Sequence, residues 1–339
     1  MTYTLEQTLK DQKDLVKLCA DRPLKTKEIF KPNAYYGLDF IIKKYLGLPR
    51  NYSLKLIFPH GPRLGNFIWG EEVKSILPII AAYNTQYEKV LKNHCEDNGY
   101  KKVILPLSFP FLYVLDLLKN HSKPKREGTI FFPFHSTHHI TAKANYEGIA
   151  EDLLKVEDRF KPITICIYWR DYNLGHHLPF QEKGFNIVSA GHMYDPYFLF
   201  RFYHLCSMHL YSASNHISNP TFYSIKAGCI FFYFDMYPQV TLSGEESHLR
   251  SDVGNIPSNL RKQLVKLFKK GDQSIDEEKT KVADHFMGTR YFMSPEELLK
   301  IVNYAEGLYK KEIIKRILIK VNRFPKRLYK KMQSMLEKF

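Results

Sequence analysis

Short apolar runs alternate with segments of helical spacing along most of the chain after residue 128. The strand-like runs are Thr129–Phe134, Ile163–Trp169, Phe185–Ser189, His209–Ser212 and Cys229–Phe234. The segments with helical spacing between them are Tyr146–Phe160, Leu174–Lys183, Tyr197–Ser207 and Asn219–Ala227. Strands that alternate with helices of roughly ten to fifteen residues predict βαβ units and a parallel sheet with right-handed crossovers.

The residues before 128 show the same pattern less regularly. Their first fifty positions predict helices and connecting segments, because prolines interrupt the chain repeatedly. Leu54–Phe58 and Lys102–Leu107 predict buried strands, and the stretch between them predicts helix. The whole pattern therefore predicts an α/β protein with two Rossmann-like halves that meet near Gly128.

Composition narrows the classes of protein to which the chain can belong. It has 339 residues, of which 44% are hydrophobic and 25% charged, as in an ordinary folded protein. No apolar run approaches the roughly 18 to 20 residues that span a bilayer, and Met1–Lys13 lacks an apolar signal core. Five scattered cysteines without a C-x-x-C pair argue against disulfides and structural zinc, and favour a cytoplasmic location.

The positive charge is concentrated at the end of the chain. The net charge is +15, and Lys310–Phe339 holds eleven Lys and Arg against two Glu, which accounts for +9 of it. Apolar residues recur there at helical spacing, at Ile313, Ile314, Ile317, Leu318 and Val321 and again after Pro325. This pattern predicts a basic amphipathic helix on an anionic membrane surface, with packing of the first stripe on the first domain as the alternative.

Polar and ionisable residues follow the predicted strands of the second half. These residues are His135, His138, Arg170, Asp171, His192, Asn215 and Ser218. Ligands of open α/β sheets bind outside the carboxyl ends of the strands, so we expect the residues to line a substrate site. A polar loop without a ligand is the alternative at each position.

One segment at these strand ends predicts a phosphate site. Ser218 or Asn219 is a good N-cap, and Pro220 suits a first helical turn, so a helix should begin there. Its free N–H groups and the hydroxyl of Thr221 could bind a phosphate, although a capped helix without a ligand fits the same residues. Gly61–Gly65 predicts a tight turn at which backbone could approach a ligand.

The chain lacks the sequence motifs of several well-known activities. It contains no D-x-D, no G-x-x-x-x-G-K-[ST], no G-x-G-x-x-G and no H-E-x-x-H. His135, His138 and His139 have spacing that suits zinc, but no third ligand cluster accompanies them. We therefore expect no metal and no cofactor.

Three regions of the chain resemble known proteins of polysaccharide biosynthesis. Asn33–Asp39, Lys44–Pro49 and a strand that ends in His60-Gly61 resemble the opening of bacterial capsule and surface-polysaccharide biosynthesis proteins. Phe185–Phe234 resembles the donor-binding domain of GT-B glycosyltransferases. Phe286–Gly288 with Ser294–Leu298 is similar to the closing part of such domains.

The resemblance implies a GT-B-like fold with two Rossmann-like domains that face each other across a cleft. Residues 1–128 would form the acceptor-side domain, residues 129–295 the nucleotide-sugar donor domain, and residues 296–339 C-terminal helices with the basic tail. The implied activity transfers a sugar, without a metal, to a glycan or lipid-linked acceptor of capsule or lipopolysaccharide biosynthesis. The cysteine usage and the basic tail predict a location in the cytoplasm, peripheral to the inner face of the cell membrane.

The resemblance also implies roles for individual residues. His60 would serve the acceptor hydroxyl as acid or base, with Glu71, Glu72 and His135 in reserve, although His60 could instead cap its turn. Arg170 and the helix start would stabilise the diphosphate leaving group. The expected substrate-binding residues are Gly61, Arg63, His138, Arg170, Asp171, His192, Asn215, Ser218, Asn219 and Thr221.

Two other functions remain open at this point. A sugar-nucleotide epimerase would share the fold and need no acceptor and no membrane contact. A basic nucleic-acid-binding protein is the other alternative, but the charge is concentrated in the tail and no aromatic RNA-binding pattern is present, so no nucleic-acid partner is expected.

Overall fold

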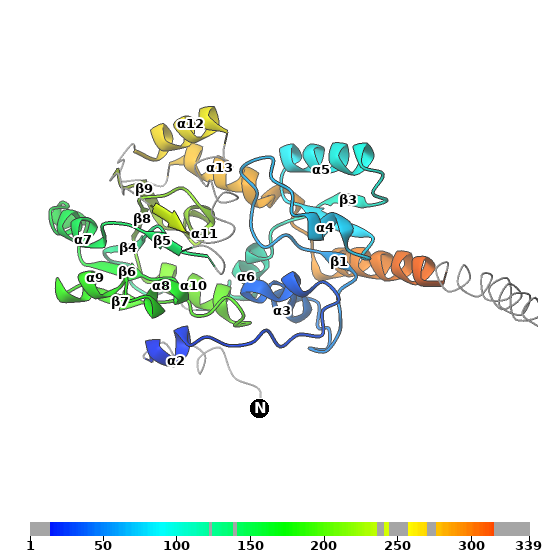
Figure 1. Ribbon diagram of the computed structural model, residues 1–339, viewed down its shortest axis with the longest axis horizontal. Coiled ribbons are helices and arrows are strands. Elements are labelled where there is room, and N and C mark those ends of the chain that lie inside the picture. Colours follow the sequence, from blue (N-terminus) through cyan, green and yellow to red (C-terminus); the bar gives the residue numbers. More distant parts are fainter. Residues whose placement is uncertain are drawn as a thin grey trace, which may run out of the picture.

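The structure, a computed structural model, describes residues 14–121, 124–137, 141–235, 241–243, 257–269 and 276–314. Two parallel sheets lie side by side with helices around each of them (Figure 1). We call residues 14–121 the first half, which holds the three-stranded sheet, and residues 124–243 the second half, which holds the five-stranded sheet. The predicted α/β class with parallel sheets is confirmed.

The sheet of the first half contains three parallel strands in chain order. They are β1 (Leu56–Ile57), β2 (Ile79–Ala82) and β3 (Val103–Pro106). Helices α4 (Gly70–Lys74) and α5 (Thr85–Asp97) connect them. The prediction of helix throughout the stretch between β1 and β3 is wrong, because β2 is there. All four β2 residues are buried, so the strand lacks the alternation that distinguishes it from a buried helix.

The sheet of the second half confirms the predicted alternation. Its strands are, in spatial order, β7 (Asn186–Val188), β6 (Ile163–Cys166), β4 (Thr129–Phe132), β8 (Tyr211–Ser214) and β9 (Ile230–Tyr233), all parallel. The connecting helices include α7 (Tyr146–Leu154), α9 (Leu178–Glu182), α10 (Phe198–Ser207) and α11 (Asn219–Lys226). Numbered along the chain, the strand order is 3-2-1-4-5, as in Rossmann folds, and it reverses direction between β4 and β8.

The remaining elements surround these sheets. They are α2 (Leu15–Cys19), η2 (Lys31–Gly37), α3 (Leu38–Tyr45), α6 (Phe111–Leu117), η3 (Asp158–Phe160), α8 (Trp169–Asn173), α12 (Ser258–Lys269), α13 (Glu277–Met287), η4 (Thr289–Tyr291) and a last helix over residues 295–314. A short antiparallel pair, β5 (Thr141–Lys143) with β10 (Thr241–Ser243), was not predicted. Each of its strands has only three residues, which is too short for a periodic signal.

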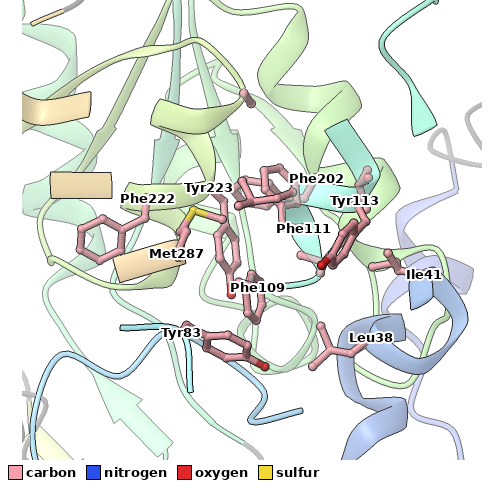
Figure 2. Close-up of a cluster of buried hydrophobic side chains, with 14 of the residues drawn as sticks. Leu38, Ile41, Tyr83, Phe109, Phe111, Tyr113, Phe202, Phe222, Tyr223 and Met287 are labelled. Atoms are coloured by element: carbon pink, nitrogen blue, oxygen red, sulfur yellow. The ribbon is translucent and has the colours of Figure 1, made fainter. Parts of the chain in front are cut away.

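A stack of three aromatic rings joins the two halves. The ring of Tyr223 on α11 lies between Phe109 and Phe111, at centroid distances of 5.1 and 5.2 Å and interplanar angles of 8° and 27°. Phe202 of α10 meets Tyr223 edge-on at 5.6 Å. Figure 2 shows these rings packed with Tyr83 and Met287 from elements far apart in the sequence. The same buried cluster includes side chains of both sheets, so the two halves share one hydrophobic core.

Two hydrogen bonds beside this stack connect the first half to the end of α13. Phe109 N donates to Met287 O at 2.9 Å, and Ser108 Oγ donates to Gly288 O at 2.8 Å. Gly288 has a φ of +66°, and a Cβ there would lie 2.5 Å from the carbonyl oxygen of Tyr83. Only glycine therefore allows α13 to end against the first half.

The first described residues contact the second half, and the last helix contacts the first half. Near the start, Leu18 O accepts from His192 N at 3.1 Å, and Cys19 O accepts from Asn173 Nδ2 at 2.9 Å. The last helix lies beside β1 of the first half (Figure 1), and its Leu298, Val302 and Ala305 are fully buried in the shared hydrophobic cluster. Tyr52 Oη also donates to Glu306 at 3.2 Å.

The structure describes only the first part of the predicted tail. The apolar contact with the first half begins before the predicted stripe, and Ile314, a member of that stripe, is 56% exposed. The residues from 315 onward, which carry most of the predicted membrane-binding helix, lie outside the described residues. Membrane contact by the tail therefore stays a prediction.

Replacing Phe109 with alanine should destabilise both halves together. The change removes a fully buried ring from the stack, so we expect the free energy of unfolding to fall by about 3 to 5 kcal/mol. Trp69 lies in the first half and Trp169 in the second, so Trp69→Phe and Trp169→Phe backgrounds report the two halves separately.

Urea unfolding followed by tryptophan fluorescence in both backgrounds checks this expectation. The midpoints should coincide and shift together with Phe109→Ala. Leu154→Ala, at a side chain that is 49% exposed, is the control and should shift them little. Two separate transitions, of which Phe109→Ala moves only one, would contradict a shared core.

Candidate functional site

A cavity of about 520 Å³ lies between the two halves, which is within the usual range for small-molecule sites. We call it the central cavity. Its lining includes residues of η2, of the segment after β1, and of the ends of β4, β6 and β8, together with the start of α11. The aromatic side chains in this lining are Phe30, Tyr35, Tyr36, Phe67, Trp69, Phe132, Tyr168, Tyr194, Phe198, Phe202 and Tyr223.

The cavity lies where the strand order of the second sheet reverses. His135 follows β4 and His216 follows β8, and both line the cavity. Asn215 holds the two strand ends together, because its Oδ1 accepts from Phe134 N at 2.9 Å. Such a reversal point leaves a crevice at the carboxyl ends of the strands, which is where ligands of open α/β sheets bind.

Helix α11 begins at the cavity, as the sequence predicted. Ser218 is its N-cap residue, and Ser218, Asn219 and Pro220 line the cavity. Thr221 is fully buried, and its Oγ1 accepts from Ser218 N at 3.3 Å. Thr221 is absent from the cavity lining, so its hydroxyl stabilises the helix start, whereas Ser218 and Asn219 face the space where a ligand fits.

The segment after β1 forms the opposite wall. Gly61 lies so close to α11 that a Cβ on it would be 2.0 Å from Asn219 Nδ2. The sequence suggested that this glycine lets backbone approach a ligand; in the structure it lets the two halves approach each other. Pro62, Arg63, Leu64 and Gly65 line the cavity beside this contact.

His60 lies in the cavity wall among aromatic rings. Its ring centroid is 6.0 Å from those of Tyr35 and Trp69 and 6.5 Å from that of Tyr36. Burial lowers the pKa of His60 to about 3, and the nearby positive charge of Arg63 adds to the effect. The ring of His60 is therefore neutral at physiological pH and is a weaker base than an ordinary imidazole.

The structure distinguishes the two neighbouring glutamates, which the sequence could not. Glu72 is buried, and its Oε1 accepts from Arg63 Nη2 at 2.8 Å while its Oε2 accepts from Tyr87 Oη at 3.2 Å. Glu71 is exposed and also lines the cavity. Glu72 therefore holds Arg63 in place, and Glu71 is the carboxylate available to a ligand.

Several predicted site residues instead hold the second half together. Asp171 is fully buried and accepts from Ser136 Oγ at 2.7 Å and from His176 Nδ1 at 2.9 Å when that nitrogen is protonated. Arg170 Nη2 donates to Thr141 Oγ1 at 3.2 Å, which ties α8 to β5.

His192 and Asn215 belong to the same group. His192 is fully buried, with Nε2 3.3 Å from Asp21 Oδ1 of the N-terminal segment. Like Arg170 and Asp171, His192 and Asn215 are absent from the cavity lining, so the structure does not bring them together with the predicted site residues that line it. His138 lies outside the described residues.

The sequence missed most of the aromatic lining. Tyr35 and Tyr36 come from η2, Trp69 precedes α4, and Tyr168 precedes α8, so no spaced motif connects them. The high content of Phe, Trp and Tyr, 14% of the chain, indicated stacking surfaces but not their location. Their convergence depends on how the two halves pack.

Comparison with known proteins leaves the family of the chain open. It matches no protein-family model, and a search of curated proteins finds no match. Within the described ranges, no group of three or more His, Cys, Asp or Glu side chains could hold a metal ion. No helix in this part of the chain is long and apolar enough to cross a membrane.

The depressed pKa of His60 should make the protein less stable in acid. The folded imidazole titrates at about 3 and the unfolded one near 6.5, so the unfolded chain binds an extra proton between these values. Stability should therefore fall as the pH drops below about 6.5. His60→Asn removes this contribution. Between pH 7 and pH 5, the unfolding free energy of the variant should therefore fall by up to about 2 kcal/mol less than that of the wild-type protein.

Urea unfolding at several pH values measures this difference. The exposed His121 gives the control His121→Asn, which should follow the wild-type pH dependence. Parallel curves for His60→Asn and the wild-type protein would show that His60 is not held neutral.

Gly61→Ala should strain the contact between the halves. The new Cβ would overlap the side chain of Asn219, and overpacking of this kind costs about 1 to 3 kcal/mol. Asn219→Ala removes the overlapping atoms, so Gly61→Ala/Asn219→Ala should regain most of the lost stability. A double-mutant cycle from thermal unfolding checks the rescue; additive losses would mean that the two residues do not touch.

Proposed function

We propose that this chain is a glycosyltransferase with a GT-B-like arrangement of its two halves. It would transfer a sugar from a nucleotide-sugar donor to a glycan or lipid-linked acceptor of a bacterial surface polysaccharide. The observation that carries the proposal is the position of the central cavity, between two parallel sheets and at the reversal point of the five-stranded one. A two-substrate transfer needs a cleft of this kind, with one substrate on each side.

The donor belongs on the second half in this proposal. The N-terminus of α11 lies at the cavity, and the positive end of the helix dipole points to it at Ser218 and Asn219. His135 and His216 line that end of the cavity, where their rings can contact a bound donor. Aromatic rings such as Tyr168 supply a surface on which the base or the sugar can stack.

The acceptor belongs on the first half, where His60 and Glu71 are available to take its proton. His60 is neutral and can accept a proton, but its low pKa makes the transfer less favourable than for an ordinary imidazole. A bound diphosphate would raise the pKa of His60, because a nearby negative charge favours the imidazolium. The proposed base is therefore His60 in the donor complex, with Glu71 as the alternative.

A ligand screen tests the donor assignment. Thermal unfolding is followed with UDP, GDP, CMP and the common sugar derivatives of UDP and GDP. A nucleotide sugar at about 100 times its dissociation constant should add about 2.7 kcal/mol of stability. If none of these compounds shifts the unfolding temperature, the proposed function fails. Conversion of a nucleotide sugar without any acceptor would favour an epimerase.

Turnover of the nucleotide sugar found by the screen tests the base. His60→Asn should lower the release of nucleoside diphosphate about 10²- to 10⁴-fold while donor affinity stays nearly unchanged. Because the free-enzyme pKa of His60 is about 3, kcat/KM should show no limb from this group between pH 5 and 8. Near-parental turnover of His60→Asn, combined with a large loss in Glu71→Gln, would transfer the role to Glu71.

A further inference from the structure

Two tyrosine hydroxyls meet inside the central cavity, one from each half. Tyr36 Oη and Tyr168 Oη are 3.3 Å apart, within hydrogen-bond distance, and both residues line the cavity. Tyr36 belongs to η2 of the first half, and Tyr168 precedes α8 of the second half. The pair therefore lies where a donor on one side and an acceptor on the other would come together.

The position of Tyr36 is closely constrained. Its backbone has a φ of +57°, in the left-handed region that non-glycine residues rarely adopt. Its N–H donates to Met193 O at 2.6 Å, and its ring meets Phe198 edge-on at 4.9 Å. Both contacts are with the second half, and together they hold the Tyr36 hydroxyl against Tyr168.

Each tyrosine of the pair lies near a histidine of the cavity. The Tyr36 ring centroid is 6.5 Å from that of His60, and the Tyr168 ring centroid is 4.7 Å from that of His135. Burial, followed by the neighbouring Tyr36, raises the pKa of Tyr168 well above its usual value, so this hydroxyl keeps its proton.

The hydrogen-bonding capacity of the pair suits a neutral polar ligand. A phenolic hydroxyl has one proton to donate and lone pairs that accept. When one tyrosine donates to the other, the second hydroxyl keeps a proton that it can donate to a ligand. A sugar hydroxyl is likewise a donor and an acceptor, whereas a diphosphate accepts only and gains more from charged or helix-terminal donors.

We propose that the Tyr36–Tyr168 hydroxyl pair binds a hydroxyl group of the sugar that is transferred. This assignment rests on the proposed function and adds the two residues that would determine which sugar is accepted. The nucleotide would lie toward α11, and the sugar would extend to the meeting point of the halves. If the pair had a purely structural role, removing a hydroxyl would lower the stability of the protein. It would not weaken the binding of a nucleotide sugar more than that of the nucleotide alone.

Tyr36→Phe and Tyr168→Phe test the assignment, because each keeps the ring and removes one hydroxyl. Calorimetric titrations use UDP with UDP-glucose and UDP-N-acetylglucosamine, and GDP with GDP-mannose. For whichever sugar derivative the wild-type protein binds, each variant should weaken binding about 3- to 10-fold, as expected for one neutral hydrogen bond. Affinity for the matching nucleotide without the sugar should change less than about twofold.

Tyr45→Phe is the matched control, because Tyr45 Oη donates to Met293 O at 3.0 Å and the residue is absent from the cavity lining. It should lower stability and leave both affinities unchanged. Equal losses for nucleotide and nucleotide sugar, or no loss for either, would overturn the assignment while the proposed function stands. A wild-type protein that binds none of the probes would overturn both.

Discussion

The stack of Phe109, Tyr223 and Phe111 is the contact on which the rest of the structure depends. Two sheets of three and five strands would each leave apolar surface exposed at the place where they meet. Aromatic rings bury a large area there, and their offset stacking adds specificity of position. Tyr223 also lines the central cavity, so one side chain belongs to the joint and to the candidate site.

The contact between the two halves therefore determines the shape of the central cavity. Interfaces between domains usually permit relative motion unless they are large and hydrophobic, and here one buried cluster runs through both sheets. The contact of Gly61 with Asn219 and the hydroxyl pair of Tyr36 and Tyr168 both join the two halves at this cavity. The distance between the walls therefore follows from packing of the core, before any ligand is present.

The polar residues near the cavity divide into two groups for a physical reason. Buried polar groups must be paired, and Asp171, Glu72 and His192 each have partners within the protein. These partners hold loops and helix ends in place. The groups that remain at the cavity include the imidazoles of His60, His135 and His216, the exposed Glu71 and the start of α11. This set suits recognition by hydrogen bonds and ring stacking more than by paired charges.

Local patterns were enough to predict the five strands of the second half and the start of α11. Alternating strand and helix periods, and an N-cap followed by proline, act over a few residues and can be read without the fold. The same patterns missed β2, since a strand buried on every residue has no polar side to mark its period. They also missed β5 and β10, which pair across about a hundred residues of chain.

What the patterns could not decide was which polar residues face the cavity. Asp171 and His60 both follow strands and look equally suited to a site in the sequence. Asp171 accepts hydrogen bonds from Ser136 and His176. His60 instead lies among the rings of η2 and of Trp69, and burial there lowers its pKa to about 3. Burial and partners come from residues far apart in the chain, such as Asp21 and His192, so only the packing of the two halves could decide the chemistry of the site.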